Sequence, residues 1–280
     1  MLVNTLALLR MAERGEFPIG AFNVYNLEGA LAVVQAAEAA ASPVMLQIMG
    51  GSTKRVGRPL AALCLEAASS ASMPMAVHLD HCSSRDEIEG WLEAGLKSVM
   101  ADGSDLDYEA NVEFTRDIAK TVHYNDGVVE AELGRLTGEE DGLTIPDYES
   151  KLTDPALAAD FVERTGADVL DVCIGNVHGR YRSDPRLDFE RLEAIERTVT
   201  APLALHGGSG LDDDSVRRCI ELGVRKINVN TELRTAYVRS LAESVSAGDQ
   251  PEFVDVMDRA VAAMRDVVAG KLRLFGSSGG

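Results

Sequence analysis

Short apolar segments recur along the chain, and each is followed by a longer stretch with a helical pattern. The segments are rich in β-branched residues and are bounded by Gly or Pro. Their starts lie 23 to 41 residues apart, which is the spacing of a strand, a crossover helix and the next parallel strand. The eight segments are residues 18–23, 43–48, 74–79, 97–102, 127–133, 168–174, 201–206 and 224–229.

Eight parallel strands with helices outside close most readily into a (β/α)8 barrel. We therefore predict an α/β protein with the TIM-barrel fold, in a single domain that spans residues 1–280. An open, doubly wound sheet is the structural alternative. It is disfavoured because no GxGxxG turn follows an early strand and no change of composition marks a second domain.

Two stretches fall outside this repeat. Residues 134–155 are polar, rich in glycine and acidic residues, and too long for an ordinary connection, so we predict a mobile active-site loop over the barrel mouth. Residues 252–272 have apolar side chains at a helical period, which predicts an extra C-terminal helix packed outside the barrel. We expect the last residues, 276–280, to form a flexible tail.

Composition and charge narrow the function. The chain has 280 residues, 46% of them hydrophobic, which excludes a disordered or fibrous protein. Its 45 acidic and 27 basic residues give a formal charge of −18, which repels nucleic acids and anionic membrane surfaces. There is no apolar run near the ~20 residues of a membrane span and no secretion signal, so we expect a cytoplasmic protein. Its four scattered cysteines are expected to be reduced packing residues.

Polar residues stand where several predicted strands end, which is where barrels of this kind carry their catalytic groups. Three of the five histidines, His81, His178 and His206, follow three different strands. Three imidazoles at one barrel mouth, with a carboxylate such as Glu132 or Asp102 nearby, suit a divalent transition metal and best of all zinc with an open position. Such a metal would act as a Lewis acid.

His78 precedes His81 by three positions. If the alternation of a strand continues through this stretch, the two side chains face opposite sides, which favours a structural role for His78.

Two glycine-rich or polar turns predict a phosphate site. The sequence HGGSG at residues 206–210 follows the seventh strand, and NVNT at residues 228–231 closes the eighth, just before a helix. Backbone amides of such a turn and of a helix N-terminus bind anions, and the hydroxyls of Ser209 and Thr231 add donors. The loops after strands seven and eight are the usual phosphate site of this barrel.

Taken together, these residues resemble a known family, the class II, metal-dependent ketose-bisphosphate aldolases, which include fructose- and tagatose-bisphosphate aldolases. The resemblance covers almost the whole chain. Its motifs are AFNVYN at 21–26, HLDH at 78–81, VEAELG at 129–134, GEED at 138–141, NVHG at 176–179, LHGGSG at 205–210 and KINVNTEL at 226–233.

The resemblance implies a metal-dependent carbon–carbon lyase of carbohydrate metabolism, as in glycolysis. It implies that His81, His178 and His206 bind Zn²⁺, with Glu132 as an alternative or transient ligand. It also implies a monovalent cation, Na⁺ or K⁺, beside the substrate phosphate, bound by main-chain oxygens near Val177, Gly179 and Gly207.

The implied reaction is reversible cleavage of a ketose 1-phosphate or 1,6-bisphosphate into dihydroxyacetone phosphate and an aldehyde. The resemblance implies that Asp80 is the acid/base at the C4 hydroxyl. Glu140, in the long loop, would exchange the proton of dihydroxyacetone phosphate. The residues implied to hold the ketose and its phosphate are Asn23, Gly179, Gly207, Gly208, Ser209, Asn228, Asn230 and Thr231.

The substrate within this class stays open. Met49 stands at about the position where fructose-bisphosphate-specific relatives place a serine for the distal phosphate. Arg234 matches a position where some relatives use arginine for that phosphate, which points to a distal phosphate or sulfonate. Lys54 and Arg55 are further candidate contacts, although a solvated face suits them better. Fructose, tagatose and sulfofructose phosphates are the candidates.

Two alternatives remain at this stage. One is a Schiff-base aldolase, for which Lys226 would be the reactive lysine. The other is a non-catalytic barrel subunit that binds sugar phosphate and stabilises a partner, which the presence of both Asp80 and Glu140 disfavours. The resemblance further implies a homodimer or homotetramer.

Overall fold

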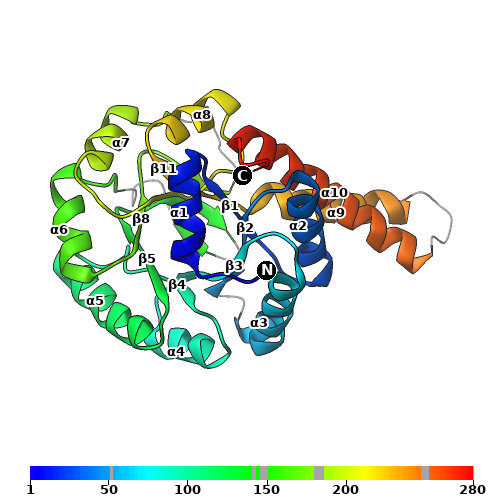
Figure 1. Ribbon diagram of the computed structural model, residues 1–280, viewed down its shortest axis with the longest axis horizontal. Coiled ribbons are helices and arrows are strands. Elements are labelled where there is room, and N and C mark those ends of the chain that lie inside the picture. Colours follow the sequence, from blue (N-terminus) through cyan, green and yellow to red (C-terminus); the bar gives the residue numbers. More distant parts are fainter. Residues whose placement is uncertain (51–52, 141–142, 146–150, 180–185, 247–251, 280) are drawn as a thin grey trace.

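The computed structural model describes residues 1–50, 53–140, 143–145, 151–179, 186–246 and 252–279, with the side chains of 53–56, 139–140 and 143–145 excepted. Its main feature is a closed barrel of parallel strands (Figure 1). The strands are, in the order of their pairing, β1 (Ile19–Asn23), β11 (Val224–Val229), β10 (Leu203–Leu205), β8 (Val169–Val172), β5 (Val128–Leu133), β4 (Ser98–Ala101), β3 (Met75–Cys82) and β2 (Val44–Met49). Each overlaps one predicted segment, so the predicted TIM barrel is confirmed.

Helices surround this barrel on the outside (Figure 1). They are α2 (Leu27–Ala40), α3 (Thr53–Ser70), α4 (Arg85–Glu93), α5 (Tyr108–Tyr124), α6 (Pro155–Thr165), α7 (Phe189–Glu196), α8 (Asp213–Glu221) and α9 (Thr231–Ser246). Several begin at a short polar residue whose side chain accepts a backbone N–H of the first turn, as Ser84, Asp107 and Asp212 do. The large apolar core fills the space between these helices and the outer face of the strands.

A further helix, α1 (Thr5–Gly15), closes one end of the barrel and lies across its centre in Figure 1. Its Leu8 and Leu9 are fully buried in a second apolar cluster. The strand residues of that cluster are Ile19, Ala21, Met45, Ala76, Val128, Val169 and Ala204, most of which lie near the N-terminal ends of their strands. The floor is therefore sealed, and only the C-terminal end can open to a substrate.

A small second sheet stands beside the barrel mouth. It joins β6 (Thr137–Glu140) to β7 (Leu143–Ile145) in antiparallel fashion and to β9 (Val177–His178) in parallel fashion. The predicted active-site loop, residues 134–155, contributes β6 and β7. Its mobility stays a prediction.

The C-terminal helix α10 (Phe253–Phe275) confirms the extra helix expected over 252–272. It packs along α2 and α9 and projects with α9 as an arm, at the right of Figure 1. The flexibility expected of residues 276–280 stays a prediction, but the described part of this tail contacts the body of the protein. Ser277 is fully buried beside Ser42, whose hydroxyl lies 2.7 Å away, and the amide of Gly279 donates to Ala40 and Ala41. Among the helices described, none is both long and apolar enough to cross a bilayer.

Candidate active site

Three histidines meet at the C-terminal end of the barrel. His81 lies near the end of β3, His206 directly follows β10, and His178 lies in β9. All three are buried, and their ring centroids lie 4.7 to 6.1 Å apart. One nitrogen from each ring lies within 4.8 Å of the other two. The closed barrel thus brings the predicted metal ligands into one cluster.

The backbone of β3 directs His81 into this cluster. His81 has a φ of 43°, in the left-handed region, and the pairing of β3 with β4 shifts register between Leu79 and Cys82. Strand alternation ends at this point, so the expectation that His78 and His81 face opposite sides is wrong. Both lie inside the barrel, where Nδ1 of His78 contacts the hydroxyl of Ser98 at 2.8 Å.

Carboxylates hold the far nitrogens of two of these rings. Nδ1 of His81 donates to Asp102 at 2.8 Å, and Nε2 of His206 donates to Glu130 at 2.8 Å. These bonds leave lone pairs on Nε2 of His81 and Nδ1 of His206, which lie only 2.9 Å apart. Two lone pairs at that distance need a proton or a cation between them, and a carboxylate-bound imidazole is the usual form of a histidine metal ligand. The residues present therefore fit a divalent metal.

Burial keeps two of the three rings neutral. Burial, with the charge of His81, lowers the pKa of His178 to about 3. Burial and the charges of Lys226 and His81 lower the pKa of His206 well below its usual value. Burial also acts to lower the pKa of His81, but the bond to Asp102 and nearby carboxylates raise it well above its usual value. Because a ligand nitrogen must be unprotonated, metal binding here releases the His81 proton.

A second group of possible ligands shares His81 and adds Asp102 and Glu132. Burial and the charge of Asp102 raise the pKa of Glu132, and burial and the charge of Glu132 raise the pKa of Asp171. Glu132 and Asp171 face each other across β5 and β8. A cation among these acids would relieve their repulsion, which fits Glu132 as an alternative ligand.

Asp80 lies beside the histidines on β3 and is 2% exposed. Its carboxylate accepts a hydrogen bond from Asn23 at 2.7 Å and one from Asn228 at 3.2 Å. Burial acts to raise the pKa of Asp80, but the charges of His81 and Lys226 lower it overall. The ionised carboxylate is therefore ready to accept a proton. Two residues predicted to hold the ketose, Asn23 and Asn228, thus also hold Asp80.

Glu130 is absent from the predicted site residues, although it contacts His206 directly. A signal for it exists in the sequence, because Glu130 and Glu132 occupy alternate positions of an otherwise apolar strand and so share its inward face. Lys226 also has a role that differs from the Schiff-base alternative. It is fully buried, and its Nζ lies 2.8 Å from Glu130 and 2.7 Å from Asn228. This ion pair occupies the amine that a Schiff base would need, which disfavours that alternative.

The glycine-rich turn after β10 is shaped by close backbone contact. Gly207 has a φ of 68°, and a Cβ there would lie 2.1 Å from the carbonyl oxygen of Val177. The amide of Gly208 donates to Asn228 at 3.0 Å. Only glycine allows this approach. The turn therefore lies against both β9 and the end of β11, and it brings together Val177 and Gly207, two of the residues expected near the monovalent cation.

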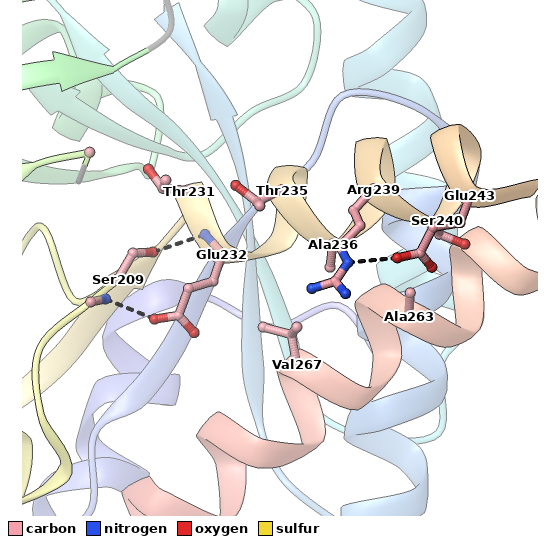
Figure 2. Close-up of a pocket in the computed structure, with 12 residues that line it drawn as sticks. Ser209, Thr231, Glu232, Thr235, Ala236, Arg239, Ser240, Glu243, Ala263 and Val267 are labelled. Atoms are coloured by element: carbon pink, nitrogen blue, oxygen red, sulfur yellow. Dashed lines mark hydrogen bonds and ion pairs between the residues drawn. The ribbon is translucent and has the colours of Figure 1, made fainter. Parts of the chain in front are cut away.

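Figure 2 shows a pocket of about 690 Å³ that starts at this turn and runs along α9 towards α10. Gly179, Ser209 and Thr231 line its inner end. The hydroxyl of Thr231 is buried and has no hydrogen-bond partner among the described residues. The Ser209 hydroxyl faces the start of α9, where it accepts long hydrogen bonds from the backbone amides of Asn230 and Glu232. These hydroxyls and the helix N-terminus form a place for an anion.

For the remaining predicted residues, contact with the substrate stays a prediction. The amide of Gly210 is occupied by the carboxylate of Glu232 at 2.8 Å, so it is not a free donor. Asn230 accepts from the hydroxyl of Tyr25 at 2.7 Å. Arg234 is half-buried on α9, and Met49 is buried at the end of β2. The backbone of Glu140 ends β6, whereas the side chains of Glu140, Lys54 and Arg55 lie outside the described residues.

Comparison with known proteins decides the family. The family model described as "Fructose-bisphosphate aldolase class-II" matches residues 3–280, almost the entire chain. The chain belongs to this family. It is a class II aldolase, and thus a carbon–carbon lyase, as its motifs indicate.

Solved structures agree with this assignment. The YdjI aldolase of Escherichia coli K12 is 35% identical, with a TM-score of 0.89 over 100% of this chain and 99% of that one. A proposed fructose-1,6-bisphosphate aldolase from Coccidioides immitis is 34% identical, with a TM-score of 0.93 over 99% of this chain and 97% of that one. The fructose-bisphosphate aldolase of Campylobacter jejuni, at 22% identity, has the same fold, with a TM-score of 0.83 over 99% of this chain and 96% of that one.

Proposed function

We propose that this class II aldolase uses Zn²⁺ to cleave, reversibly, a ketose 1-phosphate or 1,6-bisphosphate into dihydroxyacetone phosphate and an aldehyde. The observation that carries the proposal is the convergence of three buried imidazoles, His81, His178 and His206, next to the ionised carboxylate of Asp80. Two rings are already oriented by carboxylates with their lone pairs inward. A neutral, nitrogen-rich donor set of this kind suits zinc.

When bound, zinc supplies Lewis-acid polarisation of the ketose carbonyl and stabilises negative charge that develops beside it. Asp80 removes the proton of the C4 hydroxyl. The C3–C4 bond then breaks, C4 becomes the aldehyde carbon, and the bonding electron pair stays on C3. The hydrogen bonds from Asn23 and Asn228 hold the Asp80 carboxylate in place for this proton transfer.

Glu140 returns a proton to C3 and so completes dihydroxyacetone phosphate. It belongs to the 134–155 segment, and its backbone stands in β6, which pairs with β9 through Gly138 and His178. This pairing keeps β6 next to a proposed metal ligand. Closure of the segment over the site would exclude water from the carbanionic carbon.

The phosphate of the substrate binds at the turn after β10 and the start of α9. Three features support this placement. They are the Thr231 hydroxyl, which has no hydrogen-bond partner among the described residues, the Ser209 hydroxyl and the N-terminus of α9. A Na⁺ or K⁺ ion beside the phosphate, near Val177, Gly179 and Gly207, would offset the strongly negative charge of the chain. Fructose, tagatose and sulfofructose phosphates remain the substrate candidates, with Arg234 as the contact to the distal anion.

The test is an assay of the purified protein with fructose 1,6-bisphosphate, tagatose 1,6-bisphosphate, their 1-phosphates and sulfofructose 1-phosphate. We expect cleavage of at least one of them, loss of activity with a chelator and recovery with Zn²⁺. Activity that survives complete removal of metal would contradict the proposal. A fully metallated protein that cleaves none of these compounds would instead support the non-catalytic sugar-phosphate-binding alternative. Sedimentation of the same sample would test the expected homodimer or homotetramer.

A further inference from the structure

The proposed mechanism leaves two charged side chains inside the barrel without a role, Glu130 of β5 and Lys226 of β11. Glu130 is 2% exposed and Lys226 is fully buried. Taking two charges out of water is costly, and an apolar pair of similar volume often serves stability equally well. Stability by itself therefore does not account for an ion pair at this place.

Glu130 controls which nitrogen of His206 carries the proton. Its Oε1 lies 2.8 Å from Nε2 of His206 and 2.8 Å from Nζ of Lys226. The same oxygen forms the ion pair with the ammonium of Lys226. A carboxylate oxygen in an ion pair only accepts hydrogen bonds, which puts the proton on Nε2 of His206 and leaves the lone pair on Nδ1. That lone pair faces Nε2 of His81, within the cluster of ligand nitrogens.

Lys226 controls the orientation of the Asn228 side chain. Nζ of Lys226 donates to Oδ1 of Asn228 at 2.7 Å, which turns the amide nitrogen of Asn228 the other way. That nitrogen donates to Oδ1 of Asp80 at 3.2 Å. A flipped amide would present an oxygen to the carboxylate and repel it. The lysine thereby fixes the direction of a hydrogen bond to the proposed acid/base.

We propose that Glu130 and Lys226 are positioning residues, joined as one ion pair, that orient the proposed metal ligand His206 and the acid/base Asp80 together. The proposal rests on the proposed function, because it assigns the metal and proton-transfer roles to those two residues. Its chain of contacts runs from His206 through Glu130, Lys226 and Asn228 to Asp80. Loss of the pair should therefore weaken zinc binding and slow proton transfer even where the protein remains folded.

The decisive variant replaces both partners, Glu130→Met/Lys226→Met. It removes both buried charges at once, so a pair with a merely structural role would be replaced without loss of zinc affinity or of turnover. We expect instead a folded protein whose zinc dissociation constant, measured by competition with a chromophoric chelator, rises about 10- to 100-fold. At saturating zinc, kcat should fall at least about 10-fold, because Asp80 loses the orientation that it needs for proton transfer.

Two further proteins make the result interpretable. Ser98→Ala changes an equally buried polar residue that contacts His78 and neither member of the pair, so it should keep wild-type zinc affinity and kcat. Glu130→Gln keeps the shape of the side chain and removes its charge, so it should also bind zinc about 10-fold more weakly. This single variant tests the proposal if the double variant fails to fold. The absorption spectrum of bound Co²⁺ should shift in Glu130→Gln and stay unchanged in Ser98→Ala.

Wild-type zinc affinity and turnover in the folded double variant would overturn the proposal. Failure of the proposed function looks different. If the wild-type protein cleaves no ketose phosphate, the zinc dissociation constants still test whether Glu130 orients His206. A weaker zinc affinity in Glu130→Gln supports that role, and an unchanged affinity refutes it.

Discussion

At the scale of single residues, the site depends on one unusual backbone torsion and on buried hydrogen bonds. The positive φ of His81 lets two successive residues of β3, Asp80 and His81, serve the same cavity, which plain strand alternation would forbid. Asp80 then lies beside the cluster of imidazoles, held by two asparagine amides. The proposed proton acceptor and the proposed metal site are thereby neighbours along the chain and in space.

Replacement of Asp80 by alanine tests the proton-transfer role. We expect Asp80→Ala to retain zinc at wild-type stoichiometry, because its oxygens accept from Asn23 and Asn228 and are not among the grouped ligand atoms. Turnover should fall by about 100- to 10,000-fold, the usual contribution of a positioned acid/base. Steady-state kinetics with metal analysis measures both quantities. Near-normal turnover would remove Asp80 from its role.

His78, which is not a proposed metal ligand, gives a pH prediction. Burial lowers its pKa from 6.5 in the unfolded chain to about 3 in the folded protein. Between these values the unfolded chain binds a proton that the native protein does not, so His78 destabilises the fold progressively as pH falls from 6.5 to 3. The slope is about 1.4 kcal/mol per pH unit at most.

The variant His78→Gln cannot take up that proton. The unfolding free energy of the wild type, measured by denaturant titration, should therefore drop relative to that of the variant as pH falls below 6.5. Above pH 7 the difference between the two proteins should be constant. A difference that stays flat from pH 7 to pH 5 would show that His78 takes up its proton in the native state as readily as in the unfolded chain.

At the scale of elements, the site is assembled by strands that meet through glycine. The turn after β10 approaches β9 so closely that a side chain at Gly207 would overlap the carbonyl of Val177. The strand β9 in turn carries His178, and β6 approaches β9 at Gly138, where a Cβ would lie 2.1 Å from the carbonyl oxygen of His178. Three segments far apart in sequence are thus packed backbone to backbone around His178, a proposed metal ligand.

A methyl group at Gly207 should disturb both the turn after β10, where we propose that the phosphate binds, and the proposed metal site. Gly207→Ala places a Cβ 2.1 Å from the carbonyl oxygen of Val177 and strains a φ of 68°, at a cost of about 1–3 kcal/mol from the torsion alone. We expect KM for the phosphorylated ketose to rise at least about 10-fold. The matched control is Gly90→Ala in α4, where a Cβ meets nothing within 4 Å and helix propensity favours alanine. An unchanged KM in Gly207→Ala would contradict this account of the turn.

At the scale of the whole molecule, the barrel has an apolar floor and a polar mouth. Helix α1 seals the lower end with Leu8 and Leu9, whereas charged and amide side chains fill the upper interior. The buried acids of that interior repel one another, and the lone pairs of His81 and His206 face each other. A bound metal ion would relieve both repulsions. Metal binding and folding should therefore be coupled.

Removal of zinc should lower stability. A ligand that binds only the native state at 1,000 times its dissociation constant adds about 4 kcal/mol. We expect the thermal midpoint of the zinc-loaded protein to fall on addition of a chelator and to recover with excess Zn²⁺. His206→Ala should show a much smaller response, because one of the three imidazoles is missing. An identical midpoint with and without zinc would show that the cluster binds no metal in the native state.

The barrel and much of the site could be predicted because they rest on local pattern. Apolar segments at regular spacing identify parallel strands, and the histidines at their ends mark the mouth of the barrel. The features that could not be predicted concern local backbone geometry and packing. The break in alternation at His81 depends on a register shift against β4, and the burial of Ser277 is accompanied by its hydrogen bond with Ser42. Neither feature produces a periodic pattern in the sequence.

The sequence by itself determined the fold class, the family and the set of side chains that can bind a metal, because spacing and motifs are properties of the chain alone. Only the tertiary structure decided how those side chains are used. It joined Glu130 to Lys226 and His206, turned the Asn228 amide towards Asp80, and made Lys226 an ion-pair partner. The physical reason is that hydrogen-bond direction and burial depend on which strands become neighbours, and closure of the barrel sets that.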